Sequence, residues 1–493
     1  MCRRRLNMKR LNDLLDNVRA LEINNPNNPE ITALEYDSRR IEAGNCFFAV
    51  TGTASDGHNY IDAAIERGAT AIICEHMPEM YHEGISYVMV EDSNVAMAAM
   101  AAAYYDYPSE ELKLVGVTGT NGKTTTATLL YDMFMAMGYN AGLISTVVYR
   151  VGKRSIHSTH TTPDAIRLNS MMREMVDEGC DYCFMEVSSH AAAQHRIDGL
   201  RFTGAIFTNL THDHLDYHGT YKEYIRAKKS FFDALVKDAW AVVNIDDRNG
   251  EVMVQNCRAS VRRLSLRSMA DYRTKIIEMQ TDGMLLSIDG QEVWVKFTGR
   301  FNAYNLTTVY AAATLLGIDR LEALTTLSNL TPVSGRFETI TATDGTMAVV
   351  DYAHTPDALE NVIETIEEVR KDTQQLFVVV GCGGDRDRTK RPEMAGIAVK
   401  HATMAIFTSD NPRTESPEAI LDDMLQGIGD ARNYLRITDR REAIRTASAL
   451  AHPGDIILIA GKGHEDYQII GIEKHHFDDR EEIATAFSTT HNK

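Results

Sequence analysis

From residue 112 onward, short runs of β-branched and apolar residues alternate with longer segments of helical spacing, and no other feature constrains the fold as strongly. Such alternation is typical of βαβ units, which build a parallel sheet with helices on its faces. After the first run, apolar residues at 129, 130, 133, 134 and 137 predict a helix that ends near Gly138. Strands are predicted at 112–117, 183–187, 205–210, 241–245, 348–352, 376–380, 405–408 and 456–460.

The length of 493 residues predicts roughly three domains, at about 150 residues per domain. Pro108 and Ser109 follow an alanine-rich helical stretch at 96–105, and residues 331–335 form a second cluster of breakers. We therefore expect an α/β protein with domains at 1–110, 111–335 and 336–493. The central domain is predicted to hold a parallel sheet of the P-loop ATPase type, and the last a Rossmann-like sheet, with ligands at the carboxyl ends of the strands.

Composition limits the partners that the chain can have. Its 51 basic and 69 acidic residues give a formal net charge of −18, which argues against a general nucleic-acid binder, because such proteins neutralise phosphates with Lys and Arg. No apolar run approaches the ~18 residues of a membrane span, no signal peptide is predicted, and Met8 is a second candidate start. Seven scattered cysteines predict reduced thiols, and the pair Cys180 and Cys183 is interpreted as core. We expect a soluble, cytoplasmic protein without nucleic-acid or membrane partners.

The loop between the first predicted strand and its helix has the composition of a phosphate-binding loop. Its glycines let backbone N–H groups approach phosphate, Lys123 can reach the terminal phosphate, and Thr124 can ligate Mg²⁺. A strict Walker spacing would require glycine where Val117 stands, so the loop is a variant. The alternative, a glycine-rich turn with a solvated lysine, is disfavoured by the strand–loop–helix setting. The predicted nucleotide-binding residues are Gly119, Thr120, Asn121, Gly122, Lys123, Thr124 and Thr125.

Acidic and histidine residues follow two of the predicted strands. Glu186 ends the strand at 183–187, while His212, His214 and His218 follow the strand at 205–210. A glutamate and a histidine at neighbouring strand ends suit a site that holds Mg²⁺ and polarises a transferring phosphoryl group. By themselves the histidines are equally compatible with surface positions or with zinc. The adjacent phosphate loop favours magnesium, because phosphates and carboxylates prefer a hard cation.

Together, GTNGKTT at 119–125, MEVSSH at 185–190 and TNLTHDHLDYHG at 208–219 resemble the Mur ligase family of ATP-dependent, amide-forming enzymes. Blocks at 37–39 and 44–58 are similar to the nucleotide-sugar-binding N-terminal domain of the family's tripeptide synthetases. Further similar blocks, in family order, lie at 161–164, 301–305, 335–338, 351–357, 381–388 and 461–465.

The resemblance implies a ligase of peptidoglycan precursor synthesis. ATP phosphorylates the free carboxylate of UDP-MurNAc-L-Ala-D-Glu, an amino-acid amine attacks the acyl phosphate, and ADP and phosphate leave. Two Mg²⁺ ions and Lys123 would neutralise the crowded anions. The implied catalytic residues are Lys123, Glu186, His214 and Lys228. Thr124 and Glu186 would hold one metal ion, and His214 and Lys228 the other, with Lys228 carbamylated (N6-carboxylysine). From the residues alone, Lys228 is a solvated position on a helix.

The same resemblance implies two sets of substrate contacts. The ATP contacts beyond the phosphate loop are Asn305, Arg336 and Asp351. The UDP-muramoyl contacts are Tyr36, Ser38, Thr53, Ser55, Thr161, Thr162, Ser188, Gln194 and Arg196. His160 and His212 depart from the residues frequent in the family and stay outside the predicted sites. Family precedent implies a monomer whose domains close around the substrates.

The segment Asp410, Asn411, Pro412 and Arg413 bears on which amino acid is added. Without context it is equally well an ordinary Asn-Pro turn. Within the family it resembles the signature for meso-diaminopimelate, whose distal carboxylate would meet the planar fork of Arg413. The resemblance pairs Arg386 with the same carboxylate, and Gly461 and Glu465 with the ammonium and backbone groups.

Other functions compete with this interpretation. A lysine-adding tripeptide synthetase or a folylpolyglutamate synthase would also join an amine to a carboxylate, but the segments at 37–39 and 410–413 argue against both. A P-loop NTPase that acts as a switch or motor belongs to a different class and would leave the first and last domains unexplained.

Overall fold

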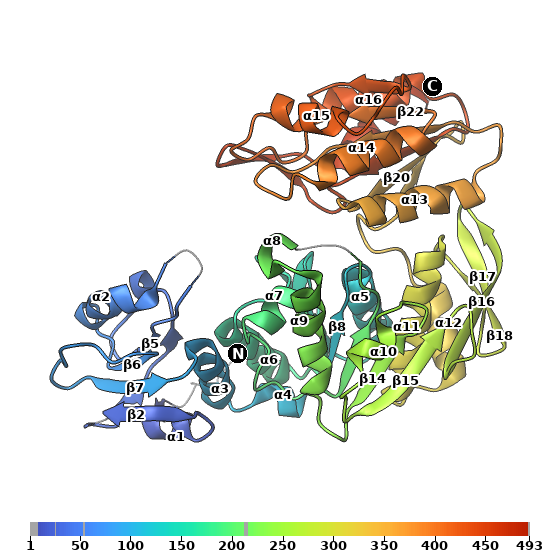
Figure 1. Cartoon of the computed structure of the whole chain (residues 1–493). Coiled ribbons are helices and arrows are strands. Elements are labelled where there is room, and N and C mark those ends of the chain that lie inside the picture. Colours follow the sequence, from blue (N-terminus) through green and yellow to red (C-terminus); the bar gives the residue numbers. More distant parts are fainter. Residues whose placement is uncertain (1–7, 25, 53–54, 212–214, 492–493) are drawn as a thin grey trace.

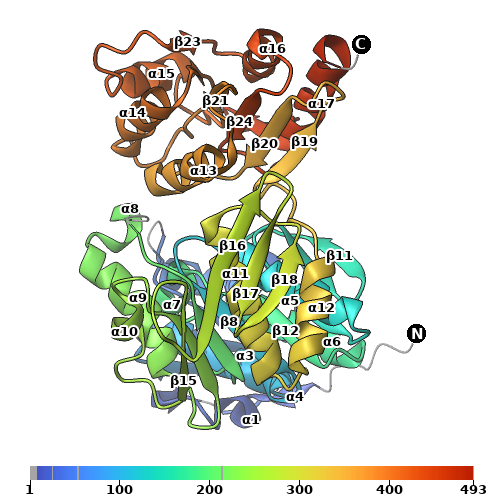
Figure 2. The same ribbon diagram turned by 90° about the vertical axis from the view of Figure 1, so that its right-hand side faces the viewer.

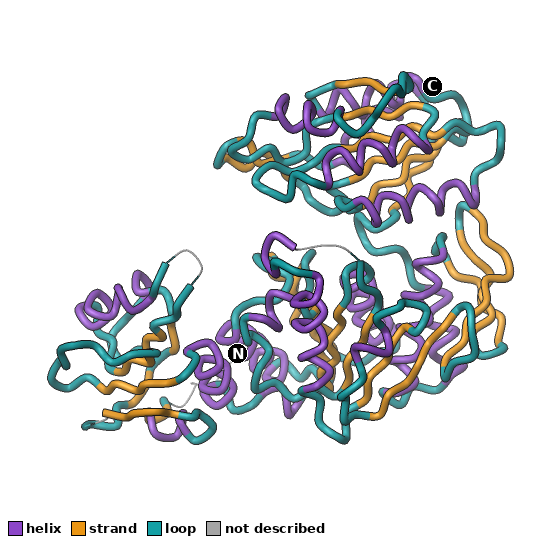
Figure 3. Tube along the Cα trace, viewed as in Figure 1, coloured by secondary structure: helices purple, strands orange, loops and turns teal. Residues whose placement is uncertain are grey.

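The computed structural model describes residues 8–24, 26–52, 55–211 and 215–491, which form three lobes in chain order (Figure 1). Each lobe is built around its own sheet with helices packed against it, as the distribution of strands and helices in Figure 3 shows. No helix among these residues is long and apolar enough to cross a membrane.

The first lobe holds a five-stranded sheet in the order β2-β7-β6-β5-β4, parallel except for β2. The strands of this lobe are β1 (Lys9–Arg10), β2 (Ala20–Asn24), β3 (Glu30–Ile31), β4 (Leu34–Glu35), β5 (Cys46–Phe48), β6 (Ala71–Cys74) and β7 (Ser86–Val90). Its helices are α1 (Leu11–Leu15), η1 (Ser38–Arg40), η2 (Gly57–Tyr60), α2 (Ile61–Glu66) and α3 (Ser93–Tyr104). The alanine-rich α3, predicted at 96–105, packs on this core and also meets α6 of the central lobe at Ala165.

The central lobe is an eleven-stranded sheet in the order β11-β10-β9-β12-β8-β13-β14-β15-β16-β17-β18. Its strands are β8 (Lys113–Thr118), β9 (Ala141–Ile144), β10 (Val148–Val151), β11 (Arg154–His157), β12 (Tyr182–Glu186), β13 (Gly204–Phe207), β14 (Trp240–Asn244), β15 (Ser260–Ser265), β16 (Tyr272–Gln280), β17 (Gly283–Ile288) and β18 (Gln291–Val295). In the sheet, the neighbouring strands β9, β12, β8, β13, β14, β15 and β16 run parallel. Antiparallel strands extend both edges: β10 and β11 beside β9, and β17 and β18 beside β16. Glu186 pairs with Val117 and Phe207 with Thr118, so three parallel strands end at one edge.

Helices cover both faces of the central sheet. Val115 and Val117 point to one face and Leu114 to the other, as the two-residue period of a strand requires. The first face packs against α5 (Lys123–Ala136), α11 (Arg300–Leu315) and α12 (Arg320–Asn329), which Figure 2 shows beside β16–β18. The second packs against α6 (Ala165–Asp177), α7 (Ser189–Ala193), α9 (Tyr221–Asp233) and α10 (Gly250–Met253). The short helices α4 (Pro108–Glu111) and α8 (Leu215–His218) complete the lobe.

The last lobe contains a six-stranded sheet in the order β19-β20-β24-β21-β22-β23, in which only β19 is antiparallel. Its strands are β19 (Glu338–Thr341), β20 (Met347–Asp351), β21 (Leu376–Val380), β22 (Met404–Phe407), β23 (Tyr434–Arg436) and β24 (Ile456–Ala460), with a separate hairpin of β25 (Tyr467–Ile470) and β26 (Glu473–His476). The helices α13 (Pro356–Val369), α14 (Lys390–His401) and α15 (Pro417–Leu425) cover one face. The helices α16 (Arg440–Leu450) and α17 (Asp479–Thr490) cover the other.

The eight predicted strands are present as β8, β12, β13, β14, β20, β21, β22 and β24, and the predicted helix is α5. Gly138 ends that helix with φ of 88°, a conformation that glycine adopts without strain. The prediction at 205–210 was too long, because β13 ends at Phe207 and the next residues turn to hold the phosphate loop. Cys180 and Cys183 are buried, and burial raises the pKa of both thiols, as inert core cysteines require.

Candidate active site

The phosphate loop lies between β8, which ends at Thr118, and α5, which begins at Lys123. Gly119 and Gly122 have φ values of 153° and 85°, in the region that favours glycine. A Cβ on Gly119 would lie 1.9 Å from Thr208 Oγ1 and 3.0 Å from a backbone oxygen of the neighbouring loop. Both glycines are therefore required by the loop, which leaves its backbone close to any bound phosphate at the helix N-terminus.

The residues that follow β13 hold the phosphate loop in place. Asn209 O accepts from Thr120 N at 2.8 Å, and Asn209 Oδ1 accepts from Asn121 N at 2.9 Å. Thr208 Oγ1 donates to Asn121 O at 2.6 Å. Sequence reasoning placed Thr208 and Asn209 near the site but gave them no role. Their position directly after a predicted strand was the available signal.

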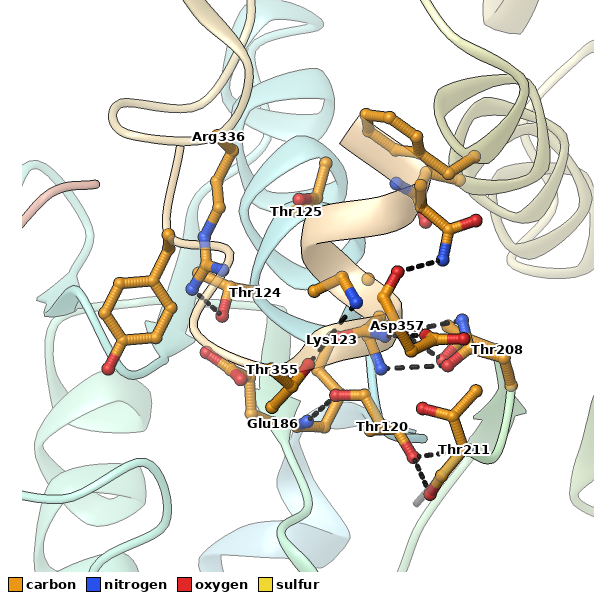
Figure 4. Close-up of a pocket in the computed structure, with 18 of the residues that line it drawn as sticks. Thr120, Lys123, Thr124, Thr125, Glu186, Thr208, Thr211, Arg336, Thr355 and Asp357 are labelled. Carbon is orange, nitrogen blue, oxygen red and sulfur yellow. Dashed lines mark hydrogen bonds between the residues drawn. The ribbon is translucent and has the colours of Figure 1, made fainter. Parts of the chain in front are cut away.

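Two lysines converge on one carbonyl of the loop. Lys123 Nζ donates to Gly119 O at 3.0 Å and to Thr120 O at 2.7 Å, so its side chain folds back over the loop (Figure 4). Lys228 Nζ, on α9, donates to Gly119 O at 2.7 Å, and the residue is 2% exposed. The interpretation of Lys228 as a solvated helix position was therefore wrong. Two lysine ammonium groups beside the N-terminus of α5 suit this loop to bind an anion.

Glu186 is fully buried at the end of β12, next to the phosphate loop. Its Oε1 accepts from Thr146 N at 2.7 Å and its Oε2 from Thr146 Oγ1 at 3.2 Å. Glu186 and Thr124 line the same cavity of 680 Å³. A carboxylate and a hydroxyl oxygen are the kind of ligands that Mg²⁺ takes in proteins, so the donor set fits this ion. Lys228, as a free amine, does not fit as a ligand without the implied carbamylation.

This cavity lies between the central and last lobes, and residues of both contribute to it. Arg336, which precedes β19, donates from Nη2 to Thr124 Oγ1 at 3.2 Å (Figure 4). Its guanidinium lies over the Tyr352 ring, 4.5 Å from the ring centroid. Asp357 Oδ2 on α13 accepts from Asn121 Nδ2 at 3.1 Å. The phosphate loop is thus contacted at two points by the last lobe.

The other predicted nucleotide residues lie in the same cavity. Asn305 lies close to the phosphate loop: a Cβ added to Gly122 would be 2.6 Å from Asn305 Oδ1. Asp351 accepts from Phe337 N at 2.7 Å and from Ala353 N at 2.8 Å. Burial raises the pKa of Asp351 above its ordinary value, while the Arg336 charge acts in the opposite direction.

Several predicted UDP-substrate residues form a hydrogen-bonded group beside Glu186. Thr162 Oγ1 donates to Glu186 O at 2.8 Å and accepts from Ser188 N at 3.1 Å. Arg196 Nη1 donates to Thr162 O at 2.7 Å, and its Nε donates to Gln194 Oε1 at 3.0 Å. Together with Thr161, whose Oγ1 accepts from Thr146 Oγ1, these side chains form one connected group.

The first lobe supplies the remaining predicted substrate residues. Burial, and then the Asp164 charge, raise the pKa of Tyr36, while Arg196 lowers it, so this tyrosine lies near the group around Arg196. Ser38 begins the short helix η1, and Ser55 is exposed and donates to Tyr60 OH at 3.1 Å. The predictions on Thr53 and His214 lie outside the described residues.

A second cavity, of 1420 Å³, lies beside the first and contains most of the predicted amino-acid site. Its lining includes Arg386, Asp410, Asn411, Arg413, Gly461 and Glu465. The side chains of Arg386 and Arg413 both lie near Gly383, where a Cβ would be 3.8 Å from Arg386 Cγ and 3.0 Å from Arg413 Nη1. Pro412 is buried and does not line the cavity.

Arg413 has a φ of 52°, which is uncommon for a residue with a side chain. Hydrogen bonds on both sides hold it: Arg413 N donates to Ile469 O at 3.1 Å and Gly471 N donates to Arg413 O at 2.8 Å. Arg413 Nη1 donates to Gly384 O at 2.8 Å. The surrounding backbone thus holds a strained conformation at a residue that lines the cavity, and such strain is frequent at functional sites.

Comparison with known proteins assigns the chain to a family. Residues 30–105 match the Mur ligase family catalytic domain, residues 117–313 the Mur ligase middle domain, and residues 335–463 the Mur ligase glutamate ligase domain. The chain belongs to the Mur ligase family, as the resemblance implied. It is 52% identical, over 97% of its length and 99% of the relative's, to a UDP-N-acetylmuramoyl-L-alanyl-D-glutamate--2,6-diaminopimelate ligase of Phocaeicola vulgatus. It is 43% identical to the protein of the same name from Geobacillus thermodenitrificans, over 96% of this chain and 98% of that one.

Solved structures share this fold along most of the chain. A structure of a UDP-N-acetylmuramoyl-L-alanyl-D-glutamate--2,6-diaminopimelate ligase superimposes with a TM-score of 0.68 at 33% identity, covering 94% of this chain and 96% of that chain. MurF ligase from Thermotoga maritima, solved in complex with ADP, has a TM-score of 0.61 at 18% identity, with 93% and 97% of the chains covered. The second likeness extends to the fold alone.

Proposed function

We propose that this enzyme joins meso-diaminopimelate to UDP-MurNAc-L-Ala-D-Glu at the expense of ATP. The observation that carries the proposal is that the two cavities meet. Thr146, Thr161 and Thr211 line both the cavity that holds the phosphate loop and the cavity that holds Arg413. A carboxylate activated in the first cavity can therefore be reached by an amine held in the second.

The reaction consists of two transfers. The free carboxylate of the D-glutamyl residue attacks the γ-phosphorus of ATP, so that an acyl phosphate forms and ADP leaves. The amine nitrogen then attacks the acyl carbon, loses a proton and displaces phosphate, which leaves an amide. The Lys123 ammonium offsets the repulsion between the carboxylate and the phosphates, which would otherwise oppose their approach.

The chain would hold Mg²⁺ through Thr124 and Glu186, and a second ion through His214 and a carbamylated Lys228. When bound, Mg²⁺ supplies positive charge that neutralises the phosphate oxygens. Carbamylation would replace the cation of Lys228 with an anionic oxygen donor inside a buried site. Thr146 fixes both oxygens of Glu186, so that this carboxylate is oriented before any ion arrives.

The remaining substrate groups are assigned to the surrounding side chains. Tyr36, Ser38, Thr53 and Ser55 of the first lobe, with Thr161, Thr162, Ser188, Gln194 and Arg196, would bind the UDP-muramoyl dipeptide. Asn305, Arg336 and Asp351 would bind the nucleotide. Closure of the last lobe would exclude water from the acyl phosphate, whose hydrolysis competes with amide formation.

The charges of the second cavity match a diamino dicarboxylic acid. Arg386 and Arg413 offer two guanidinium groups to the distal carboxylate, and Asp410 and Glu465 offer carboxylates to an ammonium. L-Lysine lacks the distal carboxylate and would leave Arg413 without its partner. We therefore do not favour the lysine-adding alternative. We place the enzyme in the cytoplasm as a monomer, in the synthesis of the peptidoglycan precursor.

ADP release with UDP-MurNAc-L-Ala-D-Glu tests this proposal when meso-diaminopimelate, L-lysine and no amine are compared. We expect turnover to depend on meso-diaminopimelate and to be at background without an amine. ATP hydrolysis at one rate under all three conditions would refute the ligase function.

A further inference from the structure

Lys462 is a fully buried lysine that no predicted role includes. It follows β24 and lies between Gly461, with φ of 116°, and Gly463, with φ of 51°. Its side chain is 0% exposed. Lysine is almost never fully buried without partners, because removing its charge from water costs several kcal/mol. The partners of Lys462 therefore decide what its burial achieves.

The Lys462 ammonium joins three segments of the amino-acid cavity. Nζ lies 3.2 Å from Asp410 Oδ1 and donates to Asn411 Oδ1 at 3.2 Å, both in the segment after β22. It lies 3.5 Å from Glu465 Oε2 in its own loop and donates to Tyr467 O at 2.6 Å at the start of β25. An ammonium has three protons, so the four oxygen atoms around Lys462 offer more acceptors than it has donors.

These contacts also fix Asn411, which sequence reasoning placed among the ligand contacts. Asn411 Oδ1 accepts a second hydrogen bond from Ile469 N at 2.9 Å, and Asn411 Nδ2 donates to Glu465 Oε2 at 2.9 Å. Both ends of the amide are thus engaged within the protein. Asn411 connects Lys462 to β25, the strand whose Ile469 O receives the backbone N–H of Arg413.

Lys462 also sets the charge of the cavity. Asp410 and Glu465 bring two carboxylates together, and burial, then the Asp410 charge, raise the pKa of Glu465. Burial would raise the pKa of Asp410 as well, but the Lys462 ammonium and then the Arg440 charge together outweigh burial and hold that pKa below its ordinary value. Without the lysine, two buried carboxylates would repel each other and retain a proton between them. A proton there would compete with the ammonium of an incoming amino acid.

We propose that Lys462 is a positioning residue, which assembles the amino-acid site by linking the segment 410–411 to the loop at 465–467 and by balancing one of the two acceptor carboxylates. This role rests on the proposed addition of an amino acid at that cavity. Lys462 does not touch the substrate in this account. It acts through Asp410, Glu465 and the backbone that carries Arg413.

The test replaces Lys462 with methionine in the full-length enzyme and separates the kinetic constants of the three substrates. We expect the KM for meso-diaminopimelate of Lys462→Met to rise by about tenfold or more, the effect of losing a buried ion-pair partner. The KM values for ATP and for UDP-MurNAc-L-Ala-D-Glu should stay within about twofold, since none of the Lys462 contacts named above is with a residue assigned to either of these substrates. Lys462→Arg, which keeps the charge, should recover part of the loss.

A destabilised variant distinguishes positioning from general damage. Leu458→Ala removes a buried side chain from the same strand β24. It should lower the Tm while leaving the KM for meso-diaminopimelate within about twofold. If Lys462→Met does not fold, Lys462→Gln takes its place in the same comparison.

Each outcome decides one claim. A selective rise in the KM for meso-diaminopimelate, with partial recovery in Lys462→Arg, supports the proposal. Unchanged amino-acid kinetics, an equal rise for all three substrates, or an arginine variant as impaired as the neutral one would overturn it. A wild-type enzyme that turns over without any dependence on meso-diaminopimelate would instead refute the proposed function.

Discussion

Arg336 of the last lobe donates from Nη2 to the hydroxyl of Thr124 on the phosphate loop, at a distance of 3.2 Å. The two residues are 212 positions apart in the chain, and the bond joins two separate sheets. The guanidinium also lies over the Tyr352 ring, which fixes its plane. Within the described residues, the buried Nε of Arg336 has no hydrogen-bond partner, so a donor remains for a ligand in the cavity.

Arg336→Ala should weaken ATP binding, because it removes a charged donor and one of the contacts between the two lobes. Hydrogen bonds to charged groups contribute about 1.5–3 kcal/mol, so we expect the KM for ATP to rise by roughly tenfold or more. Arg445→Ala is the control, since Arg445 is half-exposed and pairs only with Glu442 among the interactions described for it. An unchanged KM for ATP in Arg336→Ala would remove this arginine from the nucleotide site.

Gly119→Ala should abolish ATP-dependent turnover. The added Cβ would lie 1.9 Å from Thr208 Oγ1, so the loop or the segment that holds it must move. Gly138→Ala is a matched control at positive φ, where a Cβ meets nothing within 4 Å. It should lower stability by about 1 kcal/mol and keep the kinetics of the wild type. Steady-state ADP release and thermal unfolding of both variants check this, and comparable activity in the two would contradict the loop geometry.

Glu186→Gln should raise the Mg²⁺ concentration that gives half-maximal activity. Glutamine retains the shape that Thr146 holds but has no negative charge for a cation. We expect an increase on the order of tenfold to a hundredfold, measured by titrating Mg²⁺ at saturating ATP. Glu174→Gln, at an exposed ion pair with Arg154, should leave the titration unchanged. A curve for Glu186→Gln that overlays the wild type would mean that this carboxylate does not hold the ion.

Arg413→Ala should affect the amino acid far more than the nucleotide. The loss of a charge-assisted contact to the distal carboxylate predicts a KM for meso-diaminopimelate that rises by about tenfold to a hundredfold. The KM for ATP should remain within about twofold. Arg441→Ala, which breaks a partly exposed ion pair with Glu482, serves as the control. Equal changes in both KM values would indicate damage to the lobe instead of a specific contact.

Much of the site could be predicted from the sequence, because its residues follow buried strands of a parallel sheet. Glu186 and the phosphate loop were found in this way, and their strands pair in register. The edge hairpins β10–β11 and β16–β18 were not predicted. Many of their side chains are half-buried or exposed, which leaves a weak strand signal.

The sequence could not predict where individual side chains point and which groups they contact. Asn411 belongs to the expected segment, yet both ends of its amide are used within the protein. Lys228 had the pattern of an exposed helix position, yet it is buried against Gly119 O. Lys462 lies between two glycines with no pattern to distinguish it from a solvated loop residue. These placements depend on contacts between segments far apart in the chain, which spacing along a single helix or strand does not encode.

A competition measurement tests the central claim most directly. The enzyme is given ATP, Mg²⁺, UDP-MurNAc-L-Ala-D-Glu and equimolar meso-diaminopimelate and L-lysine, and the masses of the products are determined. Because Arg386 and Arg413 are proposed to bind the distal carboxylate, the account predicts that nearly all product carries diaminopimelate. Product that carries lysine in comparable amount, or ADP formed without either product, would contradict it.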